Sequence, residues 1–195
     1  KYYYDRRANF LAQKGISIDH LPPSFFIGGN TKQVWENILR DDYDNWDVPT
    51  LQEEYNAYKQ DNPLPYKELI FPDVLKVLNE VKSRGLKIGL ASSSVKADIL
   101  RALKENHLDG FFDVVLSGEE FKESKPNPEI YLTALNQLGV KPNQALIIED
   151  SEKGIAAGVA AGVEVWAIKD NRFGMDQGAA KGLLDNLIDV LDLLE

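Results

Sequence analysis

The spacing of apolar residues divides the chain into two parts with different predicted structure. Up to about residue 66, apolar and aromatic side chains recur every three or four positions, which is typical of amphipathic helices. Three helices are expected there: one that ends at Gly15, one that carries Val34, Trp35, Ile38 and Leu39, and one from Thr50 to Lys59. This part of the sequence predicts a small helical unit.

From about residue 67, short apolar runs alternate with helical patterns. Strands are expected at Leu86–Ala91, Phe111–Leu116, Ala145–Ile148 and Glu164–Ile168, and helices at Val74–Val81, Ile99–Leu103, Ile130–Leu138 and Leu183–Leu194. Strands that alternate with helices form βαβ units, in which the strands are parallel and the crossovers right-handed. The predicted fold class is therefore α/β: a Rossmann-like parallel sheet with helices on both faces, joined to a small all-helical domain.

The segment Asp61–Pro65, with two prolines, is the clearest linker in the chain. It predicts a helical domain over residues 1–66 and an α/β domain over residues 67–195. The tyrosines and tryptophans of the first domain are expected to pack its core. A stacking surface for nucleic acid is disfavoured because the surrounding charge is negative.

Composition narrows the function classes. A net charge of −9 argues against broad contacts with nucleic acid or an anionic membrane. An anionic small molecule would need a local pocket of cations and backbone N–H groups. No apolar run has membrane-spanning length, the chain does not open with a signal peptide, and cysteine is absent. We expect a cytoplasmic monomer without a nucleic-acid or membrane partner.

Two adjacent carboxylates, Glu149 and Asp150, directly follow the apolar run at Ala145–Ile148. A strand that ends in acids just before a helix is typical of a ligand site in an open α/β sheet. Both groups ionise readily only beside a positive charge, and Mg²⁺ prefers such carboxylates together with water and phosphate. The alternative is that Asp150 caps the helix and Glu149 is solvated.

Two further segments carry candidate chemistry. Ser92 and Ser93 follow a predicted strand and precede a helix, so a hydroxyl and backbone N–H groups could hold a phosphoryl oxygen, or could simply cap the helix. Lys125 precedes Pro126, which favours an extended turn. Pointed inward, its ammonium would neutralise charge between a carboxylate nucleophile and a phosphate; the alternative is an ordinary surface lysine.

In this order, the three segments resemble the haloacid dehalogenase (HAD) superfamily, close to its β-phosphoglucomutase-like branch of phosphatases and phosphomutases. The matching stretches are Leu90–Ser94, Ser124–Tyr131 and Ile148–Gly154. The resemblance implies that Ser92 binds phosphate, that Lys125 is the motif's cation, and that Glu149 and Asp150 hold Mg²⁺. It also implies that residues 1–66 form the cap domain of such an enzyme.

The family's first motif, a strand that ends in Asp-x-Asp, has no match in the sequence. In the family it precedes the cap and forms the central strand, between those predicted at Leu86–Ala91 and Ala145–Ile148. The chain opens at Lys1 inside a helical pattern without an N-cap, and its single methionine is Met175. A sheet without its middle strand would leave backbone groups unpaired. We therefore expect a segment upstream of Lys1 that supplies the nucleophilic Asp.

With that segment, the resemblance implies phosphatase chemistry on a small sugar phosphate or related metabolite through an aspartyl-phosphate. Ser92, Ser93 and Lys125 would bind the phosphate. The related mutases carry a histidine and an arginine in the cap, where this sequence has Tyr3, and Thr31 with Lys32 after Gly28–Asn30. These differences favour a phosphatase, although Lys32 could still contact a second phosphate of a mutase substrate.

Two other functions stay open. Without an upstream Asp-x-Asp the chain would be a catalytically inactive HAD-like binding protein. A receiver domain of a response regulator also uses acidic strand ends with a serine and a lysine, but it would leave the helical residues 1–66 unexplained.

Overall fold

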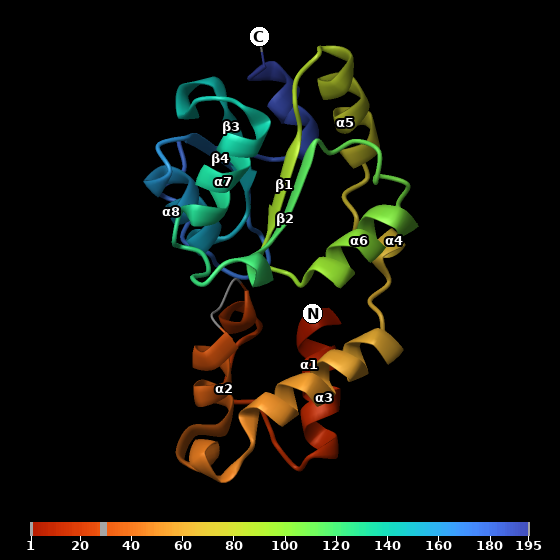
Figure 1. Ribbon diagram of the computed structural model, residues 1–195, viewed down its shortest axis with the longest axis vertical. Coiled ribbons are helices and arrows are strands. Elements are labelled where there is room, and N and C mark those ends of the chain that lie inside the picture. Colours follow the sequence, from red (N-terminus) through yellow and green to blue (C-terminus); the bar gives the residue numbers. More distant parts are fainter. Residues whose placement is uncertain (1, 28–30, 195) are drawn as a thin grey trace. The chain divides into compact units, whose positions relative to one another are not determined.

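The computed structural model describes residues 2–27 and 31–194, which divide into two compact units, Lys1–Pro65 and Tyr66–Glu195. We call these unit 1 and unit 2 and describe each by itself. The boundary lies one residue from the one predicted at the proline-containing linker. Figure 1 shows helices in unit 1 and both helices and strands in unit 2.

Unit 1 is helical throughout its described regular structure, in agreement with the predicted pattern. Its elements are α1 (Tyr2–Gln13), η1 (Pro23–Phe26), α2 (Thr31–Leu39), η2 (Arg40–Asn45) and α3 (Val48–Asp61). The N-terminus of α3 is capped by Asp47, whose carboxylate accepts a hydrogen bond from the Thr50 N–H. At the end of α1, Gly15 has a φ of 73°, the left-handed conformation that glycine adopts most easily.

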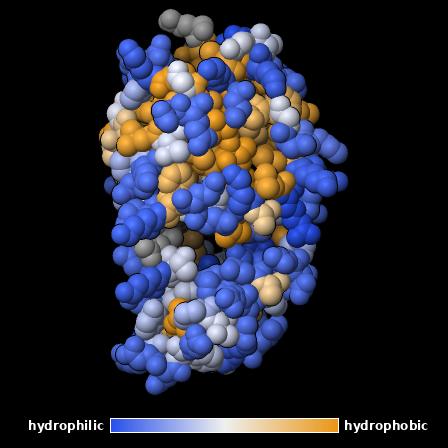
Figure 2. All heavy atoms as spheres, viewed as in Figure 1, coloured by the Kyte–Doolittle hydropathy of each residue, from blue (hydrophilic) through white to orange (hydrophobic). Residues whose placement is uncertain are grey.

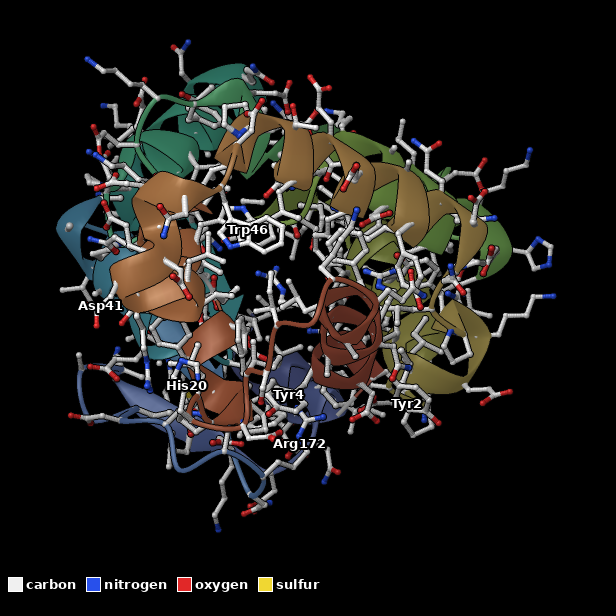
Figure 3. All side chains as sticks on the ribbon, turned by 90° about the horizontal axis from the view of Figure 1, so that it is seen from below. Tyr2, Tyr4, His20, Asp41, Trp46 and Arg172 are labelled. Carbon is white, nitrogen blue, oxygen red and sulfur yellow. The ribbon has the colours of Figure 1, made fainter. Side chains whose placement is uncertain are left out.

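The core of unit 1 is rich in aromatic residues, as predicted. Trp35 and Tyr55 are almost fully buried, and Phe10 lies against the rings of Tyr55 and Tyr58. Figure 3 shows Tyr2 and Tyr4 on opposite sides of α1. Tyr4 packs edge-on to Phe26 and donates to the Ile18 carbonyl, whereas Tyr2 is exposed. Aromatic packing therefore fixes α1 against η1 and α3.

Unit 2 has the predicted α/β architecture with parallel strands. Its helices are α4 (Tyr66–Leu69), α5 (Val74–Ser83), α6 (Lys96–Glu105), η3 (Gly118–Glu120), α7 (Glu129–Leu138), η4 (Pro142–Gln144), α8 (Glu152–Ala160) and η5 (Leu187–Asp192). Its strands are β1 (Gly89–Ser92), β2 (Val114–Ser117), β3 (Leu146–Glu149), β4 (Glu164–Ile168) and β5 (Gly182–Leu184). All strand pairs in the described residues are parallel.

The strands form two sheets instead of one. β1 pairs with β2, with Leu90 opposite Val115, and the other sheet has the order β3-β4-β5, with Ile147 opposite Val165. The described strands leave one edge of β1 and one edge of β3 unpaired, and every residue of β3 is only half-buried. In Figure 1 the β1-β2 ribbon stands apart from β3 and β4. The strand expected between β1 and β3 lies outside the described residues and stays a prediction.

Helices connect the two sheets into one unit. The apolar cluster under α7 and α8 contains Leu116 of β2 and is contacted by Ala91 of β1 and Ile147 of β3. The helix α5 contributes Val77 to the cluster around β4 and β5, and Val74 to the cluster around β1 and β2. Figure 2 shows apolar side chains gathered on one face of unit 2.

The predicted closing helix at Leu183–Leu194 is wrong. Gly182–Leu184 forms β5 beside β4, so β4 is internal to its sheet. The apolar spacing there matches a helix, but the Lys169 N–H donates to the Leu184 carbonyl and the Trp166 ring lies directly over Gly182. These long-range contacts favour an extended strand over a helix; the short η5 follows it.

Candidate active site at the carboxyl ends of β1 and β3

The ammonium group of Lys125 lies between the ends of the two sheets. Its Nζ donates to the Ala91 carbonyl on β1 at 3.2 Å, to the Tyr131 hydroxyl at 3.0 Å and to Glu149 Oε1 on β3 at 2.5 Å. An ammonium has three N–H donors, so each has an acceptor. Only 8% of Lys125 is exposed, which shows that it is no ordinary surface lysine.

Glu149 is held by contacts on both of its carboxylate oxygens. Oε1 accepts from Lys125 and from the Tyr131 hydroxyl, and Oε2 accepts from the Asp150 N–H at 3.1 Å and from the Ser151 hydroxyl at 3.3 Å. Burial alone would raise the pKa of Glu149, but the charge of Lys125 and these hydrogen bonds lower it below its ordinary value. Glu149 is therefore ionised and paired with Lys125.

Tyr131, at the start of α7, is the third member of this buried group. Burial and the negative charge of Glu149 raise the pKa of its hydroxyl above its ordinary value. The hydroxyl keeps its proton and donates a hydrogen bond to Glu149, while it accepts a hydrogen bond from Lys125. Tyr131 lies six residues after Lys125, in the first turn of α7, the helix that follows the loop containing Lys125.

The turn from β3 into α8 brings the carboxylate of Glu149 against the helix. Ser151 caps α8, because its hydroxyl accepts from the Gly154 N–H at 3.1 Å. A Cβ at position 154 would lie 2.1 Å from the Glu149 carboxyl carbon. Only glycine at this position leaves room for the carboxylate, whose charge also interacts favourably with the helix N-terminus.

Asp150 is exposed and lies at the carboxyl end of β3. Partial burial of its carboxylate and the neighbouring charge of Glu149 raise its pKa, while Arg172 and Lys125 act in the opposite direction. The side chain of Gln177 donates to the backbone carbonyls of Asp150 at 2.9 Å and Ile168 at 2.8 Å. The loop after β4 therefore holds the backbone of Asp150 in place.

Ser92 and Ser93 lie where β1 ends, next to the carbonyl that binds Lys125. The Ser92 hydroxyl accepts from the Ser94 N–H at 3.1 Å, which is a local turn contact. Ser117, opposite Ser92 on β2, donates to the Ser94 carbonyl at 2.7 Å and is fully buried. α6 begins only at Lys96, whose N–H donates to Glu119, so Ser92 does not cap that helix.

The structure thus brings Ser92, Lys125 and the Glu149–Asp150 pair to one end of unit 2. Thr31 and Lys32 belong to unit 1, in the first turn of α2, and both are exposed. Lys32 lies 3.8 Å from Glu36, one turn further along. Their predicted contact with substrate stays a prediction, and Gly28, Gly29 and Asn30 lie outside the described residues.

The donor set at Asp150 fits a hard cation. In the described residues no group of three or more His, Cys, Asp or Glu side chains lies close enough to form a metal site. Mg²⁺ is commonly held by one or two carboxylates together with phosphate and water, so the carboxylates of Asp150 and Glu149 are sufficient protein ligands from unit 2. Burial and the negative charge of Glu149 raise the pKa of Asp150, and such a cation would neutralise that charge.

Sequence reasoning assigned no role to Tyr131, Gln177 or Arg172. Tyr131 is the last residue of the matched stretch Ser124–Tyr131, so the motif could have indicated that it lies near Lys125. Gln177 and Arg172 lie in a loop without a motif, and their nearness to Asp150 depends on the pairing of β3 with β4.

No described helix is both long and apolar enough to span a membrane.

Comparisons with known proteins extend these observations. A model of the haloacid dehalogenase-like hydrolase family matches residues 10–168. A phosphorylated carbohydrates phosphatase of Thermotoga maritima is 36% identical over 113 residues, which cover 55% of this chain and 52% of that protein. The pyrophosphatase PpaX of Bacillus cereus is 30% identical over 162 residues, 80% of this chain and 74% of that protein.

A solved structure has the same fold. The crystal structure of a β-phosphoglucomutase from Clostridium difficile superimposes with a TM-score of 0.80 at 24% identity, covering 97% of this chain and 85% of that one. The matched region spans about half the length of the Thermotoga relative, 52%. Because the family model matches most of the sequence, the chain belongs to the haloacid dehalogenase-like hydrolases, the family of enzymes that its motifs predicted.

Proposed function

We propose that this chain forms the cap and most of the core of a Mg²⁺-dependent phosphatase that acts on a small sugar phosphate or related metabolite. The observation that carries the proposal is the buried ammonium of Lys125, which joins the end of β1 to Glu149 at the end of β3. A positive charge fixed there is suited to a phosphate group. The printed activities of the relatives, on phosphorylated carbohydrates and pyrophosphate, support the substrate class.

In the proposed reaction, residues of unit 2 hold the phosphate. Ser92 and the N–H groups around Ser93 donate to its oxygens, and Lys125 neutralises charge as the phosphorus is attacked. The nucleophile would be the Asp that the family resemblance implies upstream of Lys1: its carboxylate attacks the phosphorus, the bond from phosphorus to the substrate's oxygen breaks, and that oxygen leaves as a protonated hydroxyl, so that an aspartyl-phosphate forms. Water then hydrolyses this acyl phosphate, which releases inorganic phosphate and restores the Asp carboxylate.

Glu149 and Asp150 would hold Mg²⁺, which when bound supplies Lewis-acid stabilisation of the phosphate oxygens. Glu149 has a second task, because it also fixes Lys125. Thr31 and Lys32 of unit 1 would contact the organic part of the substrate. Unit 1 as a cap would exclude water from the reacting phosphate.

The test is a screen of small phosphate esters on the natural protein with its upstream segment, with and without Mg²⁺. We expect release of inorganic phosphate that requires the metal and that Asp150→Ala abolishes, including turnover of a generic aryl phosphate. Turnover unchanged in Asp150→Ala would remove Asp150 from the site. Conversion of one sugar phosphate into an isomer without phosphate release would identify a mutase, and no turnover at all would support a binding protein.

A further inference from the structure

A side-chain amide joins two strand ends next to Asp150. Gln177, in the loop between β4 and β5, donates from Nε2 to the Asp150 carbonyl at 2.9 Å and to the Ile168 carbonyl at 2.8 Å. Its Oε1 accepts a hydrogen bond from the Asp170 N–H at 2.9 Å. Both N–H donors of the amide and its oxygen are therefore bound to backbone groups of unit 2.

These hydrogen bonds lie where the pairing of β3 with β4 stops. The last paired residues of the two strands are Glu149 and Ala167. The carbonyls of the next residues, Asp150 and Ile168, are both acceptors, so they cannot bond to each other. The amide of Gln177 supplies a donor to each of them. It thereby holds the two strand ends together one residue beyond the backbone ladder.

The loop that carries Gln177 is itself fixed by local hydrogen bonds. The Asp170 carboxylate accepts from three backbone N–H groups, those of Arg172 at 2.9 Å, Phe173 at 3.1 Å and Met175 at 2.9 Å. An aspartate that bonds the backbone shortly after itself closes a compact turn. This turn ends just before Gln177, so the amide is presented to the strand ends from a folded loop.

The backbone of Asp150 is held on both sides of its Cα atom. Its N–H donates to Glu149 Oε2 at 3.1 Å, and its carbonyl accepts from Gln177. Because the backbone on either side of Cα sets the direction of the Cα–Cβ bond, these two hydrogen bonds fix where the carboxylate leaves the turn. Outer partners that orient a metal ligand in this way strengthen metal binding.

We propose that Gln177 is a positioning residue that holds Asp150 so that its carboxylate and that of Glu149 bind one divalent cation, and that it thereby raises the affinity for the cation. The inference rests on the proposed function, in which these two carboxylates hold Mg²⁺. The amide is bound to backbone groups, so Gln177 acts through Asp150 and is not itself a ligand. The loop between β4 and β5, which carries no motif, becomes part of the metal site.

The test compares Gln177→Met with Asn106→Leu in the natural full-length protein. Both substitutions keep the approximate size and the charge of the side chain and remove its amide. Asn106 is a matched control, because its amide also donates to two backbone carbonyls, those of Ala102 at 2.9 Å and Tyr66 at 3.3 Å, which belong to α6 and α4 instead of β3 and β4. Mn²⁺, which suits the same oxygen ligands as Mg²⁺, is the probe, and unbound Mn²⁺ is counted by electron paramagnetic resonance.

Gln177→Met should bind Mn²⁺ about tenfold more weakly, as loss of an outer partner of a metal ligand predicts. The number of ions bound per chain at saturation should be unchanged, and Asn106→Leu should bind as wild type does. A merely structural role of Gln177 would reduce the folded fraction, and with it the number of ions bound, without a change in the dissociation constant. That result would overturn the proposal.

If Gln177→Met does not fold, Gln177→Asn replaces it, because it keeps the amide but is one methylene too short to reach both carbonyls. An unchanged dissociation constant in that variant would equally overturn the proposal. Since the titration needs no turnover, it separates this inference from the proposed function. Should the protein hydrolyse nothing, the proposed function fails while weaker Mn²⁺ binding by the Gln177 variant still supports the positioning role.

The reverse outcome is also distinct. If wild type binds no Mn²⁺, or if the Gln177 variant binds it as tightly as wild type does, the inference fails even when the protein hydrolyses phosphate esters.

Discussion

At the scale of single residues, the buried Lys125–Glu149 pair makes the sharpest prediction. Removing one partner leaves an unpaired buried charge, which costs about 3–5 kcal/mol in comparable pairs. Lys125→Met should therefore lower the free energy of unfolding by that amount in urea denaturation at neutral pH. It should also reduce phosphatase turnover well beyond tenfold, since a preorganised charge is lost.

The matched control is Lys181→Met. Lys181 makes an ion pair with Glu164 at the same N–O distance of 2.5 Å as Lys125 with Glu149, but its side chain is 60% exposed. Exposed pairs contribute about 0–1 kcal/mol, so this variant should unfold nearly as wild type does. Similar small losses in both variants, with turnover reduced less than tenfold, would show that the charge of Lys125 contributes little to either stability or catalysis.

Substitution of Asp150 should stabilise the metal-free protein, whereas substitution of Lys125 destabilises it. Burial and the charge of Glu149 raise its pKa in the folded state, so the folded protein holds this proton more tightly than the unfolded chain does. The group therefore favours folding least above its raised pKa, and stability should decline as pH rises from the ordinary value of 3.8 through that range. At neutral pH without metal, Asp150→Asn should raise the melting temperature.

With Mg²⁺ present, wild type should instead melt at a higher temperature than Asp150→Asn. A cation that binds only the folded state stabilises it, and wild type should gain more than Asp150→Asn when Mg²⁺ replaces EDTA in a thermal melt. The variant's melting temperature should respond little to Mg²⁺. A stabilisation by Mg²⁺ that is the same in both proteins would place the bound metal away from Asp150.

At the scale of elements, the turn between β3 and α8 depends on Gly154. A Cβ there would lie 2.1 Å from the carboxyl carbon of Glu149, so Gly154→Ala must displace either the helix or the carboxylate. Overpacking of this kind costs about 1–3 kcal/mol. We expect a lower free energy of unfolding in urea and a loss of activity through the displaced Lys125.

Gly110→Ala serves as the control, because nothing lies within 4 Å of a Cβ built at Gly110. It should unfold within about 0.5 kcal/mol of wild type, as surface substitutions usually do. If Gly154→Ala were as stable and active as this control, the close packing of Glu149 against α8 would not matter for the site.

How far each element could be predicted depends on the range of the interactions that form it. β1 and β3 follow from local patterns, a short apolar run followed by polar residues. The helix α8 was expected after β3, and its cap is Ser151 instead of the alternative, Asp150. β5 could not be predicted because its apolar spacing is helical and its strand form depends on pairing with Trp166 and Ala167. Local pattern was sufficient only where tertiary contacts agree with it.

The same limit applies to the site. Ser92 and Glu149 could be placed together because parallel strands end at one edge of a sheet. Lys125, in the loop before α7, was placed with them by the family resemblance. That Lys125 contacts the Ala91 carbonyl, and that Tyr131 completes its hydrogen bonds, depends on how α7 packs across both sheets.

At the scale of the whole molecule, the two sheets of unit 2 raise the question of what lies between them. β1 and β3 each have a partner on one side only among the described strands, yet the apolar cluster under α7 and α8 includes residues of both sheets, and α5 packs on a cluster of each sheet. Unpaired backbone groups are costly in an interior. A parallel strand between β1 and β3 would pair both edges and would bring the Asp at its carboxyl end beside Lys125.

Hydrogen exchange on the natural full-length protein tests this arrangement. If a strand lies between them, β1 and β3 are paired on both sides, as β4 is. Amides in peptides over residues 89–92 and 146–149 should then exchange as slowly as those over 164–168. An internal standard is β5, which pairs on one side with β4 in the described residues and should exchange faster. Exchange of β1 and β3 as fast as that of β5 would contradict a strand between them, and the nucleophile would then have to be sought elsewhere.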